Sequence, residues 1–153
     1  MREILFRGKD RLGHWLEGGF HLWETRQPCV FDDKLKPDEI KHIIIKNSFA
    51  DWNMPRQMQP YEVIPETIGQ YTGLTDKNGK KIFEEDIVKV TNDNGETNLC
   101  SCGIGDVCFY DGAWYIGGEV NDGLYDVKNI YYIEVIGNIH DNPELLESEV
   151  DTE

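Results

Sequence analysis

The sequence lacks any apolar run of about 18 residues, the length needed to span a bilayer. Its opening, residues 1–7, has no long apolar stretch and no small-residue cleavage site, so we expect no signal peptide and a protein of the cell interior. A P-loop, a G-x-S-x-G elbow, an H-E-x-x-H pair and a G-x-G-x-x-G turn are also missing. We therefore expect a protein that is not an enzyme and that binds no cofactor.

Basic residues are scarce in the second half of the chain. Residues 82–153 hold 17 acidic side chains and only two basic ones, whereas residues 1–81 hold 12 acidic and 13 basic ones. The excess of acidic residues that gives the chain its net charge of −14 therefore lies entirely after residue 81. Because phosphate backbones are bound by clustered Lys and Arg, DNA and RNA are disfavoured as partners. The acidity either keeps the protein soluble or mimics nucleic acid in the basic groove of a host protein.

Cysteines are few and poorly spaced for a zinc site. The chain has four of them, Cys29, Cys100, Cys102 and Cys108. Structural zinc sites usually contain two closely spaced pairs, whereas this chain has one, and its four histidines are scattered. We expect free reduced thiols. The alternative is a metal-dependent enzyme that uses the last three cysteines, or Glu84 and Asp86 on one face of a strand.

The sequence pattern mainly predicts short strands and tight turns. For 153 residues, folding buries roughly two-thirds of the surface, enough for one core. Asp111-Gly112, between residues 105–110 and 113–116, predicts a hairpin. About five or six short strands between residues 82 and 137 are typical of a small closed barrel of the SH3-like type. Asn142-Pro143 then predicts a short C-terminal helix.

The first half predicts a second strand-rich layer. Gly18-Gly19 between aromatic runs indicates a hairpin, Pro37-Asp38-Glu39 indicates one helical turn, and the β-branched residues 43–45 favour a strand. The expected fold class is mostly β, with minor α. Its parts are a strand-rich N-terminal subdomain over 1–60, irregular over 32–60, a connecting segment over 61–81, an SH3-like barrel with a short C-terminal helix over 82–150, packed on the first subdomain, and a frayed tail at 151–153.

Three segments carry a family resemblance. They are the opening residues 1–7, residues 68–88, which read IGQYTGLTDKNGKKIFEEDIV, and residues 134–146, which read EVIGNIHDNPELL. Together they resemble the YopX family of small phage and prophage proteins. The resemblance implies a phage origin, a location in the cytoplasm of a bacterial host and a shared fold. It implies no mechanism.

One position departs from the family pattern. Glu85 precedes the strand that begins at Asp86, where the family commonly has glycine. If that glycine serves a positive φ, Glu85 is strained there. We favour the other interpretation, a simple bulge or turn that tolerates glutamate.

Residues 68–88, the long motif of this resemblance, have structural interpretations along most of their length. Asn78-Gly79 sets a turn, apolar side chains at 82–83 and 87–88 fill a core, and Asp86 satisfies backbone amides at the start of a strand. The exception is the triplet Gln70, Tyr71 and Thr72, which has a glycine on each side. Such glycines let a ligand or a second backbone approach closely. The triplet therefore either binds a partner or forms hydrogen bonds between the subdomains.

Aromatic side chains indicate a protein interface, because Trp and Tyr are favoured interface anchors. The candidates are Trp114, Tyr115, Tyr131 and Tyr132. We therefore expect a phage accessory protein that acts by binding protein: itself, as a homo-oligomer, a host or phage protein, or both. The alternatives are an acidic mimic of nucleic acid, which inhibits a host protein that binds DNA or RNA, and a metal-dependent enzyme. A membrane is not an expected partner.

Overall fold

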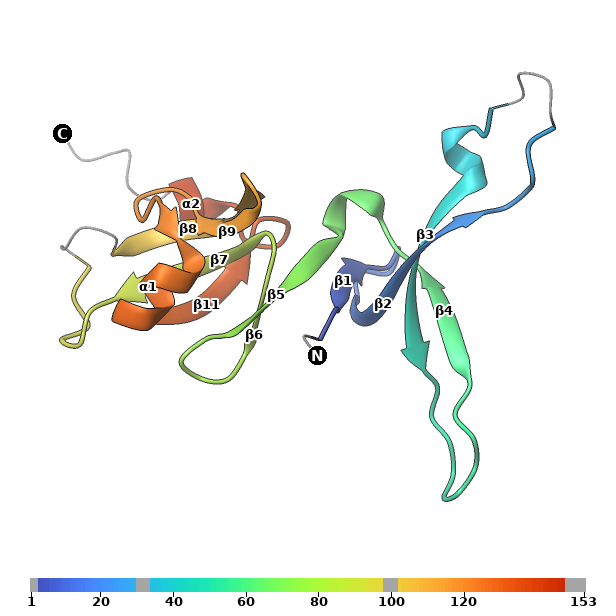
Figure 1. Ribbon diagram of the computed structural model, residues 1–153, viewed down its shortest axis with the longest axis horizontal. Coiled ribbons are helices and arrows are strands. Elements are labelled where there is room, and N and C mark those ends of the chain that lie inside the picture. The colour runs from blue at the N-terminus through green and yellow to red at the C-terminus, as the bar shows by residue number, and fades with distance from the viewer. Residues whose placement is uncertain (1–2, 30–33, 98–101, 148–153) are drawn as a thin grey trace. The chain divides into compact units, whose positions relative to one another are not determined.

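The chain folds into two units, each built mainly from antiparallel strands. The computed structural model describes residues 3–29, 34–97 and 102–147. One unit is Glu3–Gln70 and the other begins at Tyr71, a division that falls inside the connecting segment expected over 61–81. Figure 1 colours the first unit from blue to green and the second from green to red. The fold class is mostly β, as predicted.

The strands form two sheets. One has the hydrogen-bonded order β4-β3-β2-β1-β5-β6 and the other the order β10-β9-β8-β7-β11. The strands that begin in the first unit are β1 (Phe6–Lys9), β2 (Trp15–Glu24), β3 (Ile40–Asn47), β4 (Met58–Glu62) and β5 (Gly69–Thr75), with the 3₁₀ turns η1 (Pro37–Glu39) and η2 (Pro65–Thr67). Those of the second unit are β6 (Lys81–Phe83), β7 (Asp86–Thr91), β8 (Gly103–Tyr110), β9 (Ala113–Ile116), β10 (Asp122–Gly123) and β11 (Tyr132–Asn138), with helices α1 (Leu124–Ile130) and α2 (Glu144–Glu147).

The prediction of a hairpin at Gly18-Gly19 is wrong, because both glycines lie inside the long strand β2. A Cβ at Gly18 would lie 2.2 Å from the carbonyl oxygen of Ile45, so only glycine fits there. Gly19 faces open space, and a Cβ at that position would meet no atom within 4 Å. The glycine pair thus marks a close approach of β3 to β2 rather than a chain reversal.

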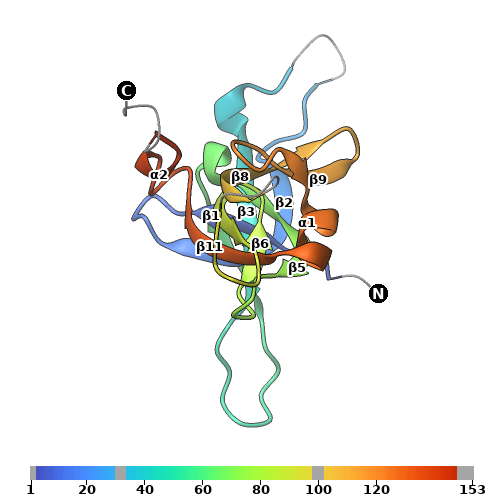
Figure 2. The same ribbon diagram turned by 90° about the vertical axis from the view of Figure 1, so that its left-hand side faces the viewer.

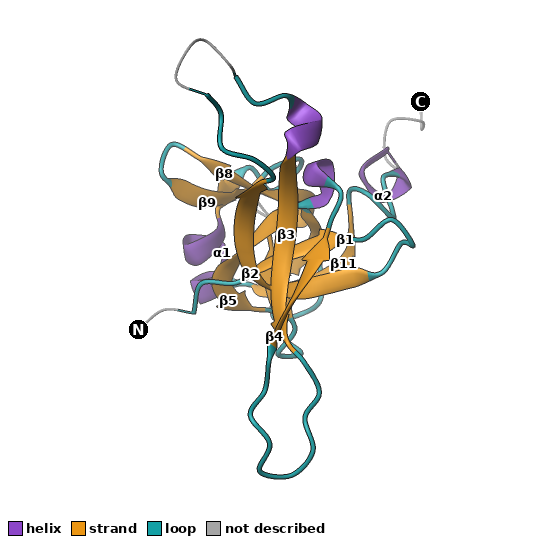
Figure 3. Ribbon diagram, turned by 90° about the vertical axis from the view of Figure 1, so that its right-hand side faces the viewer, coloured by secondary structure: helices purple, strands orange, loops and turns teal. Residues whose placement is uncertain are grey.

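The segment 32–60 is more regular than expected. The helical turn at Pro37-Asp38-Glu39 is confirmed as η1, and the strand around 43–45 is confirmed as β3. β4 pairs with β3 from Asn47↔Met58 to Ile43↔Glu62, so these two strands form a hairpin. Their connecting loop, residues 48–57, projects beyond the strands (Figures 2 and 3). The β-branched run supplies the strand propensity, and the irregularity is confined to this loop.

The hairpin at Asp111-Gly112 is confirmed. β8 and β9 pair on either side of it, and both turn residues have positive φ, +47° and +81°, as a type I′ turn requires. The short C-terminal helix is confirmed as α2. The tail at 151–153 lies outside the described residues.

The expected closed barrel is not observed in the described ranges. The five-stranded sheet is open, with β10 at one edge and β11 at the other. β10 has only two residues, and the chain then enters α1, which contacts β9 and β11 (Figure 2). Helix α1 therefore covers apolar surface that a longer strand would have covered. No helix in these ranges is long and apolar enough to cross a bilayer.

The second unit has an extensive core. The four apolar residues expected there, Ile82, Phe83, Ile87 and Val88, are all buried. Leu124 and Val127 add one face of α1 to a cluster that also contains Val90, Cys102, Val107, Ile116, Val120, Ile133 and Val135. In the first unit, the buried apolar side chains among the described residues are those of Ile43, Ile44 and Val63.

Candidate functional site

The polar residues of the long motif bond to one another and to β11. Asp76, buried in the turn between β5 and β6, accepts the amide N–H groups of Asn78 at 2.8 Å and Lys80 at 2.9 Å through Oδ1. Its Oδ2 accepts the N–H of Val135 in β11 at 3.2 Å. Asp76 therefore ties the two segments of the family resemblance together.

The surroundings of Asp76 favour its charged form. Burial alone would raise the pKa of this carboxyl group, but the amides of Val135, Lys80 and Asn78 stabilise the carboxylate. With the nearby positive charge of Lys80, they hold the pKa of Asp76 below its usual value. The carboxylate is thus a structural anion whose hydrogen bonds are made within the second unit.

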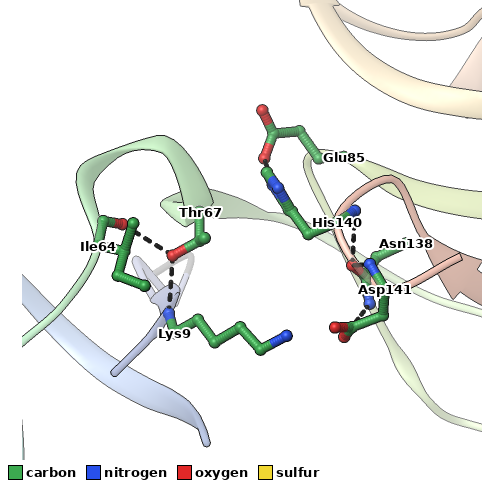
Figure 4. Close-up of polar contacts among 7 residues, drawn as sticks. All are labelled: Lys9, Ile64, Thr67, Glu85, Asn138, His140 and Asp141. Atoms are coloured by element: carbon green, nitrogen blue, oxygen red, sulfur yellow. Dashed lines mark hydrogen bonds and ion pairs between the residues drawn. The ribbon is translucent and has the colours of Figure 1, made fainter. Parts of the chain in front are cut away.

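Glu85 adopts a left-handed backbone, with φ of +66°. Glu85 does lie in a turn, between β6 and β7, as favoured, but the turn has the positive φ of the strained alternative. The N–H of Glu85 donates to Val107 O at 2.7 Å, and its carbonyl accepts the N–H of Ile139 at 3.0 Å. Its Oε2 lies 2.6 Å from His140 Nε2 (Figure 4). These contacts hold a conformation that costs a non-glycine residue about 1–2 kcal/mol.

The loop that presents His140 is fixed by Asn138. Asn138 Oδ1 accepts the amide N–H groups of His140 and Asp141, both at 3.0 Å, and its Nδ2 donates to Asp141 Oδ2 at 3.0 Å (Figure 4). The prediction that Asp86 satisfies a backbone amide is also confirmed, since Oδ2 accepts the N–H of Phe83 at 2.7 Å. The motif therefore builds structure along most of its length.

The predicted triplet is divided between the two units. Gln70 pairs with Phe6 across β1 and β5 in the first unit, and is half-buried. Tyr71 is buried with its ring centroid 5.5 Å from that of Phe83. Thr72 is buried; its hydroxyl donates to Ile82 O at 2.8 Å and accepts the N–H of Leu74 at 3.2 Å. Internal hydrogen bonding is thus observed for Thr72, within the second unit.

A hollow of about 320 Å³ brings three of the predicted residues together. We call it the aromatic hollow; it is lined by Thr72, Leu74, Ala113, Trp114, Tyr115, Gly123, Tyr125 and Asp126. The side chain of Thr72 forms internal hydrogen bonds. The groups of the hollow that a ligand could contact are therefore mainly the aromatic side chains of β9 and α1. Asp126 places one carboxylate beside them.

Exposed rings extend from the aromatic hollow onto the β8–β9 hairpin. Phe109 is exposed and its ring centroid lies 4.9 Å from that of Trp114, edge to face. Tyr110 is exposed as well, with its centroid 6.1 Å from that of Tyr115. Tyr125 is 67% exposed. Edge-to-face pairing holds these rings in defined positions on the surface, as an interface anchor requires.

The other two predicted aromatic residues lie elsewhere. Tyr131 is half-buried and packs against the core of the second unit. Tyr132 is exposed and lies opposite Thr91 in the β7–β11 ladder. Neither lines the aromatic hollow, so the structure brings together Trp114 and Tyr115 but not Tyr131 and Tyr132.

Tyr125 and Asp126 were missed because helix α1 was not predicted. Its signals are weak but present: Leu124 and Val127 have helical spacing, Asp126 lies in the first turn and Lys128 in the last. The lysine ammonium donates to the carbonyl oxygen of Thr75. A run of only seven helical residues gives little periodicity to detect.

The candidate metal ligands do not form a cluster in the described part of the chain. No group of three His, Cys, Asp or Glu side chains converges there, and Cys100 lies outside it. Burial raises the pKa of the Cys108 thiol, and the negative charges of Asp106 and Glu84 raise it further. Within the described ranges, Cys108 is a free thiol. A raised pKa makes Cys108 a poor nucleophile and a poor metal ligand near neutral pH.

The chain is similar to known proteins in both sequence and structure. A family model described as YopX protein matches residues 19–147. The chain is 30% identical over 140 residues to the SPbeta prophage-derived uncharacterized protein YopX of Bacillus subtilis (strain 168), covering 84% of this chain and 95% of that protein. Among solved structures, protein EF1440 from Enterococcus faecalis is similar, with a TM-score of 0.51 and 27% identity; the match covers 95% of this chain and 99% of that one.

Proposed function

The chain belongs to the YopX family, and we propose that it is a phage accessory protein that acts by binding protein and not by catalysis. Its site of action is the cytoplasm of a bacterial host. The partner is a host or phage protein, a second copy of the chain, or both. We further infer that the second unit is an opened variant of the SH3-like arrangement, with a five-stranded sheet of short strands and a helix before the last strand.

The observation that carries the proposal is the aromatic hollow. Its volume of about 320 Å³ suits one bulky apolar side chain of a partner. Trp114, Tyr115 and Tyr125 line it, and the exposed rings of Phe109 and Tyr110 pack edge to face on those of Trp114 and Tyr115. Interface hot spots are enriched in Trp and Tyr that lie in or around such pockets. We therefore assign the hollow to an apolar or aromatic side chain on the surface of a protein partner.

A pair of tyrosine substitutions tests this site. The tagged full-length chain is used to capture proteins from host lysate at about 0.05 M and 0.5 M salt, with identification by mass spectrometry. Tyr125→Asp places a charge in the hollow and should abolish capture of the specific partner at both salt concentrations. Tyr125→Phe keeps the ring and should retain it. Tyr132→Asp, the same change at an exposed tyrosine outside the hollow, is the matched control and should also retain it.

The proposal fails if Tyr125→Asp captures the same proteins as the unmodified chain. A partner that is lost only at the higher salt concentration, and that ignores Tyr125→Asp, supports the competing function of an acidic nucleic-acid mimic. The charge distribution favours that alternative, because residues 71–153 hold 18 acidic and only 5 basic side chains. Contacts made by exposed charges weaken with salt, whereas apolar burial does not.

A further inference from the structure

The loop between β3 and β4 exposes large apolar side chains. We call residues 48–57 the tip. Trp52 is 97% exposed and Phe49 is 92% exposed, and Met54 is exposed beside them. Soluble monomeric proteins rarely leave such a patch in water, and patches of this kind mark interaction sites. The tip projects beyond β3 and β4 (Figure 3).

A hollow of about 340 Å³ lies on one face of the same hairpin. We call it the sheet hollow; it is lined by His21, Trp23, Lys41, Ile43, Ile45, Pro60 and Glu62. These residues come from three neighbouring strands and lie opposite one another, with His21↔Ile43 and Ile43↔Glu62 as partners. Because alternate residues of a strand share a face, the exposed Met58 continues this face towards the tip.

The charges around the sheet hollow are already paired. Lys41 Nζ lies 3.1 Å from Glu62 Oε2 and 5.9 Å from the centre of the Trp23 ring. Arg11 Nη2 lies 2.8 Å from Glu62 Oε1. An apolar group can therefore cover Ile43, Ile45 and Pro60 without leaving Lys41 or Glu62 as an unpaired charge, which avoids the largest part of the desolvation cost.

We propose that the tip of one copy of this chain docks in the sheet hollow of a second copy. The inference rests on the proposed function, of which self-binding is one form. Phe49 and Trp52 of the tip offer roughly 400 Å² of apolar surface, at the 150–250 Å² that an aromatic side chain buries, and Met54 adds to it. A standard interface buries about 800 Å² on each partner, so a tip and a hollow on every copy are sufficient. The contact closes as a two-fold pair or as a ring.

Charge favours a second copy over other occupants. Residues 1–70 hold 11 acidic and 10 basic side chains, so two first units meet without net repulsion, whereas residues 71–153 carry a large excess of acid. The tip has one acid and one base, Asp51 and Arg56, like the rim of the sheet hollow with Glu62 and Lys41. A membrane is the weaker alternative, because anionic lipids repel a chain of net charge −14.

Two variants break the contact from opposite sides. Trp52→Ser removes the main apolar group of the tip. Gly19→Arg is designed to fill the sheet hollow: Gly19 lies opposite Ile45, and a Cβ at Gly19 meets no atom of its own copy within 4 Å, so the backbone accepts a side chain there. Both variants should therefore fold, which far-UV circular dichroism checks. In sedimentation velocity from about 1 to 100 μM, the unmodified chain should associate, and each variant should remain a monomer.

Mixing the two variants gives the sharpest result. The Gly19→Arg copy keeps its tip and the Trp52→Ser copy keeps its hollow, so an equimolar mixture should form pairs although each variant alone does not. Contact between two tips predicts instead that Gly19→Arg associates normally, and would overturn the proposal. Gly19→Ala and Trp52→Phe, the conservative changes, should associate like the unmodified chain. Tyr110→Ser, which removes an exposed ring of the second unit, should associate as well.

The remaining outcomes also decide the matter. An unmodified chain that stays a monomer at 100 μM contradicts the proposal, and so does a mixture that stays monomeric. Binding of a monomer to vesicles of phosphatidylcholine and phosphatidylglycerol, lost in Trp52→Ser, would assign the tip to lipid. Capture of a partner that depends on Tyr125 but not on Trp52 would leave the proposed function in place while self-docking fails. Association of the chain with itself, with no partner captured through Tyr125, would support self-docking and contradict the binding of a partner at the aromatic hollow.

Discussion

The two units differ in how their polar groups are bonded and in how many apolar side chains they bury. In the second unit, polar groups of the motif such as Asp76 and Glu85 bond internally, and eleven buried residues form one core cluster. In the first unit, three apolar side chains are buried among the described residues, while Trp23, Phe49, Trp52 and Met58 are exposed. A sheet needs a second layer over its apolar face. The second unit is thus completed by its own chain, whereas the exposed apolar side chains of the first unit are what the proposed self-docking would cover.

The largest expected effect concerns the buried anion of the second unit. Asp76→Ala leaves the amides of Asn78, Lys80 and Val135 without their acceptor, and each buried unsatisfied amide costs about 1–3 kcal/mol. We expect the free energy of unfolding to fall by about 3 kcal/mol in urea titrations. Asp93→Ala, at an exposed aspartate of the same unit, should change it by less than about 0.5 kcal/mol. An equal effect of both changes would refute the structural role of Asp76.

The same anion makes stability depend on pH. Because the pKa of Asp76 is lowered in the folded protein, its contribution is present above the unfolded value of about 3.9. It is lost as the pH falls through the folded pKa. Unfolding in urea at a series of pH values below 5 should therefore show a steeper loss of stability for the unmodified chain than for Asp76→Asn. Parallel curves would contradict this assignment.

A smaller effect is expected at Glu85. Glu85→Ala loses the contact with His140 and keeps the left-handed backbone, so it should destabilise the protein by about 1–2 kcal/mol. Glu85→Gly loses the same contact but relieves the strain, and should be more stable than the alanine variant by about 1 kcal/mol. Thermal unfolding of the two variants side by side measures that difference. Equal stabilities would mean that the backbone at this position is not strained.

The smallest effect is expected at the tip of the first unit. Trp52→Ser removes a side chain that touches little of its own copy, so the unfolding free energy at about 1 μM should change by less than about 0.5 kcal/mol. At 100 μM the unmodified chain should become more stable and the variant should not, because association stabilises the folded state by mass action. Urea titrations at the two concentrations provide the comparison. A large loss at 1 μM would place Trp52 in the fold itself.

Local signals in the sequence predicted the elements that local geometry determines. Asp111-Gly112 needs only its own positive φ angles, and the strand around Ile87 needs only the β-branched residues that form it. Gly18-Gly19 failed because the reason for glycine is the backbone of Ile45, which is distant in sequence. The closed barrel failed because β10 ends after two residues and the chain continues as α1, which leaves the five-stranded sheet open.

The candidate site was predicted in part. Trp114 and Tyr115 were chosen for residue type alone, and the hairpin places them beside Thr72. Tyr125 depended on a helix too short to show periodicity. The tip was overlooked because Phe49 and Trp52 look like core residues in a sequence, and only their exposure shows otherwise.

Amide hydrogen exchange at two protein concentrations tests most directly whether the first unit is completed by a second copy. Between about 1 and 100 μM, protection of the amides in residues 49–58 should rise, while that of residues 71–88 and 134–146 should stay constant. Protection at 49–58 that does not change with concentration, or a rise confined to residues 71–147, would contradict this division between the two units.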